Sequence, residues 1–159
     1  MNLKMTFLAI CLALILTSCS SVRDFSSNAS VVTNYEVGTV YKVKKHVFIG
    51  SIGKVEKGDY FFLKKLGDWG TGESLSEFMR RSANANFVVG IINPKETIQI
   101  VKVRQMSGTI VGRVNEVFAV VKSGRHAGVT VEVSGISKQE LKDNARVEID
   151  PDYLVVAVQ

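Results

Sequence analysis

Two cysteines and two histidines are the side chains of this protein best suited to covalent or acid–base chemistry. Cys11 lies inside an apolar run and Cys19 follows the end of that run by three residues, whereas His46 and His126 lie far apart in the remaining sequence. A thiol can be acylated, oxidised or bound to a metal, and an imidazole can act as a general base. Which of these reactions is open depends on the segments that hold the four residues.

The first 18 residues have the composition of an export signal. One positive charge at Lys4 precedes the apolar run 7–16, and the small polar residues Thr17 and Ser18 follow it. A membrane-spanning helix needs about 20 apolar residues, which is more than this run contains. The segment is therefore predicted to be a signal peptide that is removed directly before Cys19.

The residues Leu16-Thr17-Ser18-Cys19 resemble the lipobox of bacterial lipoproteins. The resemblance implies that the Cys19 thiol receives a diacylglycerol and that the new amino group is also acylated. Several acyl chains would hold the protein firmly in a bilayer, since each buried methylene contributes about 0.8 kcal/mol. In Gram-negative lipoproteins an aspartate directly after the cysteine favours retention in the inner membrane. Ser20 stands at this position, which implies that the protein is in the outer membrane and faces the periplasm. A Gram-positive host, which has no outer membrane, is left open.

Processing at this site would leave no free thiol in the mature protein. Cys11 would be discarded and Cys19 would carry the lipid, which excludes a disulfide scaffold, a cysteine nucleophile and a thiolate metal site. The covalent lipid on Cys19 is the only non-protein group expected, and no cofactor is predicted.

The mature protein is expected to be mildly basic. Removing residues 1–18 takes away one of the 20 lysines and arginines and none of the 15 acidic residues, so the formal charge falls from +5 to +4. Such a surface either serves solubility or favours anionic partners such as lipid head groups, lipopolysaccharide and acidic glycans. Nucleic acid is not an expected partner because the protein is exported.

The mature chain is long enough for one folded domain. A hydrophobic fraction of 46% favours a packed core over disorder. We expect a lipidated N-terminus and a flexible, serine-rich tether over residues 19–34, followed by a single β-rich domain over residues 35–159.

Short runs rich in valine and isoleucine, separated by glycine, asparagine, aspartate and proline, predict a mainly β fold. Val37, Thr39, Tyr41 and Val43 alternate as one face of a strand does. Short connections favour antiparallel neighbours, and hence a small antiparallel barrel or sandwich. Further strands are predicted over residues 46–50, 60–65, 87–92, 97–104, 109–114, 117–122, 129–133, 145–150 and 153–158.

Two capping boxes predict helix starts. The box at Ser74–Glu77 precedes apolar residues at helical spacing, which predicts one short helix over about 74–83, packed on the sheet. The box at Ser137–Glu140 leaves room for only one or two helical turns, so this segment is expected to be a connector.

The remaining residues do not form a recognisable catalytic or metal-binding set. A triad could be written from Ser123, His126 and an aspartate, yet no Gly-x-Ser-x-Gly motif accompanies it. His46 and His126 alone supply too few ligands for a metal. The loop 67–72 has glycines without the spacing or the lysine of a phosphate-binding loop. We therefore do not expect an enzyme.

Five residues are candidates for ligand binding. Trp69 lies in a glycine-rich loop, where its ring either stacks on a ligand or folds back over the end of the barrel. Lys42 and Lys44 share one face of a strand, and Lys102 and Arg104 share one face of another. If the two pairs were adjacent they would form a surface for an anionic partner; if separate, they would be an ordinary solvated face.

The sequence thus favours a non-enzymatic accessory lipoprotein that docks onto an envelope protein or assembly machine from its anchor in the membrane. The alternative is a binding module for an envelope glycan or anionic lipid, such as peptidoglycan or lipopolysaccharide, that uses Trp69 and a basic stripe.

Overall fold

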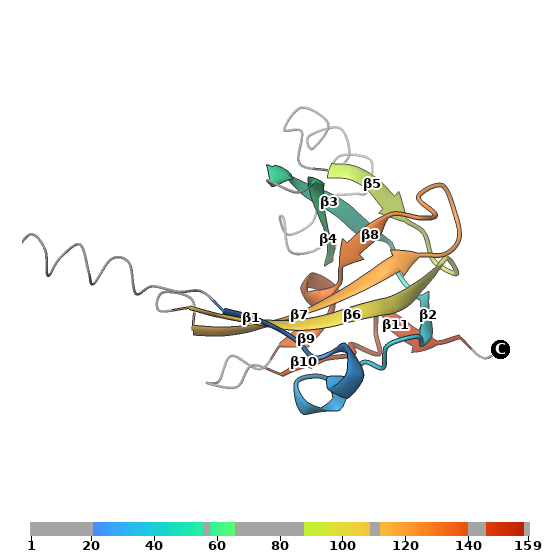
Figure 1. Cartoon of the computed structure of the whole chain (residues 1–159). Helices are drawn as coiled ribbons and strands as arrows, with labels where there is room; N and C mark the ends of the chain where they lie inside the picture. The colour runs from blue at the N-terminus through green and yellow to red at the C-terminus, as the bar shows by residue number, and fades with distance from the viewer. Residues whose placement is uncertain (1–20, 56–57, 66–87, 109–111, 140–145, 158–159) are drawn as a thin grey trace, which may run out of the picture.

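The computed structural model describes residues 21–55, 58–65, 88–108, 112–139 and 146–157 (Figure 1). Three sequence predictions lie outside these residues: the lipobox with Cys19, the loop with Trp69, and the helix over about 74–83. The prediction of a mainly β fold is confirmed.

Eleven strands and two short 3-10 helices make up the described structure. The helices are η1 (Ser26–Val31) and η3 (Ser134–Ile136). The strands are β1 (Ser21–Asp24), β2 (Val40–Val43), β3 (Val47–Val55), β4 (Gly58–Lys65), β5 (Val88–Ile92), β6 (Thr97–Gly108), β7 (Gly112–Val121), β8 (Thr130–Glu132), β9 (Lys138–Gln139), β10 (Val147–Glu148) and β11 (Leu154–Val156).

Nine of these strands form one sheet in the order β11-β2-β6-β7-β8-β4-β3-β5, with β1 also paired to β6. Figure 1 shows that the sheet curls, so that β3, β4 and β5 lie across the core from β6 and β11. All pairs are antiparallel except β4 with β8. The prediction of antiparallel neighbours holds for the consecutive strands β3–β4, β6–β7 and β7–β8, whereas β2–β3 and β5–β6 have short connections but do not pair. Strands β4 and β8 are far apart along the chain. Strands β9 and β10 form a separate small hairpin.

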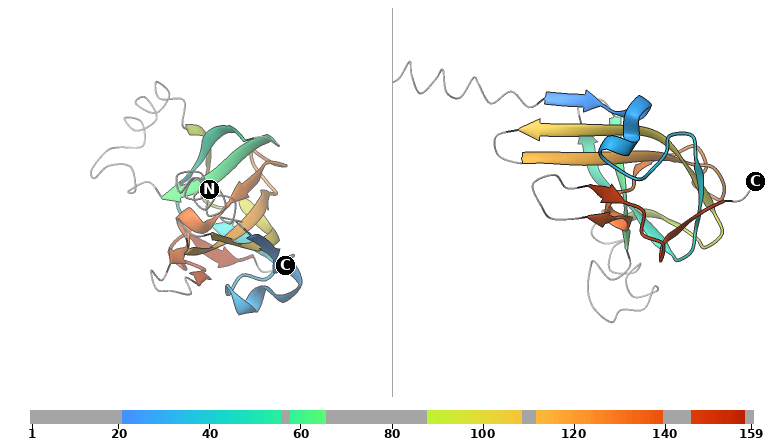
Figure 2. Two further views of the ribbon diagram at one scale, coloured as in Figure 1. Left: turned by 60° about the vertical axis from the view of Figure 1, so that its left-hand side comes forward. Right: turned by 90° about the horizontal axis from the view of Figure 1, so that it is seen from below.

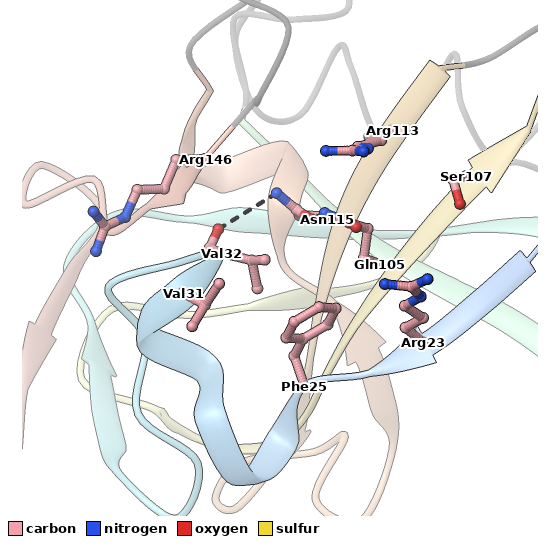
Figure 3. A pocket seen from close by; sticks show the side chains of 9 residues that line it. All are labelled: Arg23, Phe25, Val31, Val32, Gln105, Ser107, Arg113, Asn115 and Arg146. Atoms are coloured by element: carbon pink, nitrogen blue, oxygen red, sulfur yellow. Dashed lines mark hydrogen bonds between the residues drawn. The ribbon is translucent and has the colours of Figure 1, made fainter.

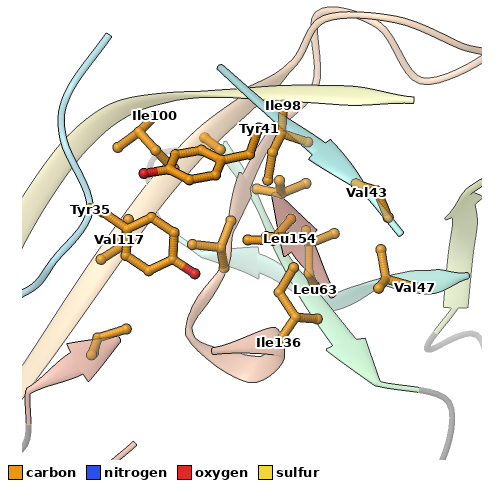
Figure 4. Close-up of a cluster of buried hydrophobic side chains, with 14 of the residues drawn as sticks. Tyr35, Tyr41, Val43, Val47, Leu63, Ile98, Ile100, Val117, Ile136 and Leu154 are labelled. Atoms are coloured by element: carbon orange, nitrogen blue, oxygen red, sulfur yellow. The ribbon is translucent and has the colours of Figure 1, made fainter. Parts of the chain in front are cut away.

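The core lies inside the curl, and alternation along β6 and β7 supplies much of it (Figure 4). A register shift in this pair leaves Val101 and Lys102 both exposed, and the shift returns Val103 to the interior. Each fully buried branched side chain contributes about 1.5–3 kcal/mol. The inward residues of the two strands are completely buried: Ile98, Ile100, Val103, Val117, Ala119 and Val121.

Strand boundaries differ from the predicted ones where turns intervene. Tyr41 and Val43 are buried as the alternation predicted, but Val37 is exposed. Gly38 has a φ of +93°, which bends the chain, so β2 begins only at Val40. The two strands predicted over 109–114 and 117–122 are one long strand, β7.

The serine-rich segment after Cys19 differs from the flexible tether that we predicted. Residues 21–24 pair with β6, and the Phe25 amide donates to the Val103 carbonyl at 2.8 Å. Ala29 and Val32 belong to the hydrophobic core. Phe25, Ala29 and Val32 recur every three to four residues, and burying them fixes the segment despite its serines. The domain therefore begins before residue 35.

The predicted helix start at Ser137 is wrong. Residues 134–136 form η3, and Lys138–Gln139 is strand β9. The Ser137 hydroxyl donates to the Val133 carbonyl at 2.9 Å and lies 2.8 Å from the Tyr35 hydroxyl. The serine therefore closes the turn that precedes it and does not cap a helix that follows.

Candidate functional site

The outer halves of β6 and β7 extend beyond the core and carry β1 along one side. We call this three-stranded region, residues 21–24, 104–108 and 112–116, the arm. Figure 2 shows β1, β6 and β7 side by side in it, with η1 next to the end of β1. The face of the arm that continues the buried face of the core holds a hollow.

This hollow, the arginine pocket, has a volume of about 560 Å³ (Figure 3). Strands β1, β6 and β7 form its base, and η1 and the residue before β10 form its side. Its lining consists of Arg23, Phe25, Val31, Val32, Gln105, Ser107, Arg113, Asn115 and Arg146.

Three arginines from distant parts of the chain line the pocket. Arg23 comes from β1, Arg113 from β7 and Arg146 from the residue before β10. None of the nine described lining residues carries a carboxylate, so this part of the lining has an excess of positive charge. Guanidinium groups bind carboxylate and phosphate oxygens through paired hydrogen bonds. The arrangement is therefore suited to an anion.

Arg146 is held in place by the backbone of the segment after η1. Its guanidinium donates to the carbonyls of Ser30 and Thr33, each at 3.3 Å, and its Nε lies 3.9 Å from the Glu148 carboxylate. The Thr33 hydroxyl also donates to the Val147 carbonyl, which ties this segment to β10. Arg146 therefore contributes charge to one side of the pocket while also joining two parts of the fold.

Neutral amides form the centre of the pocket. Gln105 Nε2 donates to Asn115 Oδ1 at 2.8 Å, and Asn115 Nδ2 donates to the Val32 carbonyl at 3.4 Å. Asn115 is buried, so its bonds fix the floor between the arginines. Phe25 and Val31 supply an apolar wall, of which Val31 is 60% exposed. The pocket thus combines positive charge with hydrocarbon.

The opposite face of the arm holds a charge network that does not open into the pocket. Arg104 is ion-paired with Glu116, and its guanidinium lies 4.7 Å from the centre of the Phe118 ring. Glu132 is buried nearby and accepts a hydrogen bond from the Ser134 amide at 2.7 Å. Burial raises the pKa of Glu132, and the Glu116 charge raises it further. This network joins β6, β7 and β8.

The structure does not bring the predicted basic pairs together. Lys42 lies opposite Thr97 on β6, five residues or about 16 Å from Lys102. Lys102 lies 3.9 Å from the Asp24 carboxylate, and Lys44 donates to the Pro151 carbonyl at 2.6 Å. The two pairs are therefore separate, and Arg104 is already engaged by Glu116.

The predicted acid–base candidates are also placed apart from one another. Ser123 Oγ accepts from the Thr97 amide at 2.9 Å, and no hydrogen bond joins Ser123 to His126 in the described part of the chain. The His126 ring lies against Gly90, where an added Cβ would be 2.4 Å from the ring. His46 Nδ1 is buried without a hydrogen-bond partner within the described ranges.

Sequence reasoning missed the arginine pocket because each of its arginines stands alone in its own segment. A signal does exist in β7, where residues 113, 115, 117, 119 and 121 share one face. The last three are apolar and buried, whereas Arg113 and Asn115 continue the same row with polar groups. A change of this kind along one face predicts that the strand extends beyond the core.

Comparisons with known proteins provide no guide to the site. The chain matches no family model, no curated protein and no solved structure. Among the described residues, no group of three or more histidine, cysteine or acidic side chains could hold a metal ion, and no helix is long and apolar enough to cross a membrane. Function must therefore be argued from the arm and its pocket.

Proposed function

We propose that this protein is a lipid-anchored, non-enzymatic module of the bacterial envelope that binds an anionic envelope component in its arginine pocket. The observation that carries the proposal is the short stretch of sequence between Cys19 and the first strand of the arm. Strand β1 begins at Ser21, two residues after Cys19, and two extended residues span about 7 Å. An anchor at Cys19 would hold the arm directly at the membrane surface.

The choice of an anionic component is based on charge. Arg23 and Arg113 line one pocket whose described lining residues include no carboxylate, and Gln105 and Asn115 add neutral polar groups. This supports the alternative that the sequence offered, although different residues carry it. Trp69 lies outside the described residues, and the basic pairs on β2 and β6 are separate.

A binding role is supported over catalysis because Ser123 and His126, the nucleophile and base suggested by the sequence, contact other residues and not each other. The Ser123 hydroxyl accepts a hydrogen bond from the Thr97 amide, and the His126 ring packs against Gly90. Catalysis by such a pair needs the base within hydrogen-bond reach of the nucleophile.

A second candidate is docking onto an envelope protein, and strand β11 favours it. Among the described strands β11 is at one end of the sheet, and its Val155 and Val156 are 48% and 52% exposed. An edge strand with exposed apolar side chains can pair with a strand of another protein. This surface is separate from the arginine pocket, so the two candidates can be tested apart.

The anchor is tested by the mass of the N-terminal peptide and by membrane fractionation of cells. We expect the wild-type peptide to begin at an acylated Cys19 and the protein to sediment with membranes. Cys19→Ala should lose the lipid and the membrane association. Cys11→Ala, the matched control inside the apolar run, should keep both. An unmodified Cys19 in the wild-type protein would refute the proposal.

The choice between the two surfaces is tested by a photo-crosslinking residue introduced at Val31 or at Val155 in the anchored protein. We expect position 31, at the rim of the pocket, to give adducts with lipid or glycan. A protein adduct from position 155, with none of either kind from position 31, would instead favour docking through β11.

A further inference from the structure

We propose that the arginine pocket binds the phosphate group of an anionic lipid headgroup in the same leaflet that holds the anchor. This inference rests on the proposed function for the place of the lipid, and it names the class of ligand for the same site.

Arg23 and Arg113 approach the pocket from opposite sides. In the register of the arm, Arg23 lies opposite Gln105 and Arg113 lies opposite Ser107. All four residues belong to one face, and the outer strands β1 and β7 are about 10 Å apart across β6. In Figure 3 the Arg23 guanidinium lies near Gln105, whereas the Arg113 guanidinium lies on the side of β7 away from β6 and Ser107. Both side chains line the same pocket, from the two outer strands of the arm.

The carboxylates that the structure describes near the arm are turned away from the pocket or lie at its edge. Asp24 and Glu116 lie opposite Arg104 in the register, on the other face of the arm. Glu148 lies beside Arg146, and both side chains are more than 40% exposed, so water weakens that pair. The Arg23 guanidinium has no hydrogen bond or ion pair within the described residues. At Arg23 an incoming anion would therefore meet little competition from the described part of the chain.

The apolar wall distinguishes a lipid headgroup from a fully hydrated anion. Phe25 packs against the core and Val31 is mostly exposed, and both line the pocket beside the arginines. A phosphodiester on a glycerol backbone has charge at one end and hydrocarbon at the other, which matches this combination. Arginine also binds phosphate with two parallel hydrogen bonds.

The far face of the arm also suits a membrane interface. Val22, Met106 and Val114 lie side by side across the three strands. Val22 is 58% exposed and Val114 is 37% exposed. This row lies at the end of the arm where β1 begins, close to the predicted anchor. Exposed apolar side chains next to basic ones favour the boundary between headgroups and acyl chains.

The test is calorimetric titration of the mature, lipidated protein in a nonionic detergent with short-chain lipids. The probes are dihexanoyl phosphatidylglycerol, zwitterionic dihexanoyl phosphatidylcholine and inorganic phosphate. We expect phosphatidylglycerol to bind at least about tenfold more tightly than phosphatidylcholine, because the choline cation opposes the arginines. Inorganic phosphate should bind more weakly than phosphatidylglycerol because it lacks the apolar part. Equal affinity for phosphate and phosphatidylglycerol would overturn the lipid as the source of the anion.

Charge-neutralising variants locate the site. Arg23→Gln and Arg113→Gln should each weaken phosphatidylglycerol binding about tenfold or more, since each removes charge-assisted hydrogen bonds. Arg125→Gln is the matched control, because Arg125 is exposed in the loop after the other end of β7. An equal loss in Arg125→Gln would mean that binding follows net charge alone and would overturn the pocket. If Arg113→Gln does not fold, Arg113→Lys, which keeps the charge, should still weaken binding.

Failure of this inference can be told apart from failure of the proposed function. The short-chain lipid is soluble, so unlipidated Cys19→Ala protein should still bind it if the pocket is correctly identified. Anchoring without phosphatidylglycerol binding would overturn the pocket's ligand, whereas binding without anchoring would overturn the membrane location.

Discussion

The inner and outer halves of the β6–β7 hairpin have the same backbone pattern but different side chains on the same face. In the inner half, Ile100 and Ala119 face the core and are completely buried. In the outer half, Gln105, Asn115 and Arg113 continue that face and line the pocket. The hairpin thus extends past the elements that cover it, and a polar row replaces the apolar one. We infer that the inner half maintains the fold and the outer half binds.

The largest expected loss of stability comes from a substitution in the inner half of the hairpin. Ile100→Ala should lower the free energy of unfolding by about 2–5 kcal/mol, because it removes a fully buried side chain and leaves a cavity. Ser107→Ala, in the outer half of the same strand, should change it by less than about 0.5 kcal/mol. Urea denaturation measures both. A comparable loss in Ser107→Ala would show that the arm is a structural part of the core.

A smaller loss of stability is expected where η3 packs against β4, across from the hairpin. A Cβ added at Gly135 would lie 2.2 Å from the Leu63 carbonyl oxygen, and this backbone atom cannot move aside as a flexible side chain could. Gly135→Ala should therefore cost about 1–3 kcal/mol in the same denaturation experiment. Gly112→Ala is the control for backbone strain without a steric clash. Gly112 has a φ of +65°, and a Cβ added there would meet no atom within 4 Å. Unchanged stability in Gly135→Ala would argue against this tight contact.

The smallest change in the free energy of unfolding is expected for Glu132→Gln, behind the arm, and this change should be a gain in stability. Burial raises the pKa of Glu132 from the ordinary value of 4.5, so the folded state binds more protons than the unfolded state just above that pH. Stability is therefore lost as the pH rises from 4.5 through the folded pKa. Glu132→Gln should be more stable than wild type at pH 7 and should lack this fall.

The pH dependence is measured by urea denaturation between pH 4 and pH 8 (about the range over which buried carboxylates titrate). The exposed Glu36→Gln is the control and should follow the wild-type curve. A Glu132→Gln protein that is less stable than wild type at pH 7 would show that the Arg104 attraction outweighs the cost of burial.

Alternation along strands could be predicted from the sequence, and contacts between distant segments could not. Tyr41 and Val43 follow the predicted face, since a strand's own pattern decides which side is buried. The parallel pairing of β4 with β8 and the assembly of the pocket depend on which strands meet, which no local pattern specifies. The segment after Cys19 was misjudged because its many serines obscured the spacing of Phe25, Ala29 and Val32.

The predicted site residues show the same limit. The pairing of β2 with β6 determines how far apart Lys42 and Lys102 lie, and the partners of Arg104 come from β7. Alternation correctly put Lys42 on an exposed face, whereas Lys102 is exposed because of the register shift after Ile100, and its neighbour Asp24 comes from β1. The lipid on Cys19 stays a prediction.

The most direct test of the central claim is equilibrium unfolding with and without dihexanoyl phosphatidylglycerol, for the mature protein and for Arg23→Gln/Arg113→Gln. At a ligand concentration 100 times the dissociation constant, the wild-type protein should gain about 2.7 kcal/mol. The double variant should match the wild type within about 1 kcal/mol without ligand and should gain almost nothing at that same concentration. The same ligand-induced gain in the double variant would contradict the account.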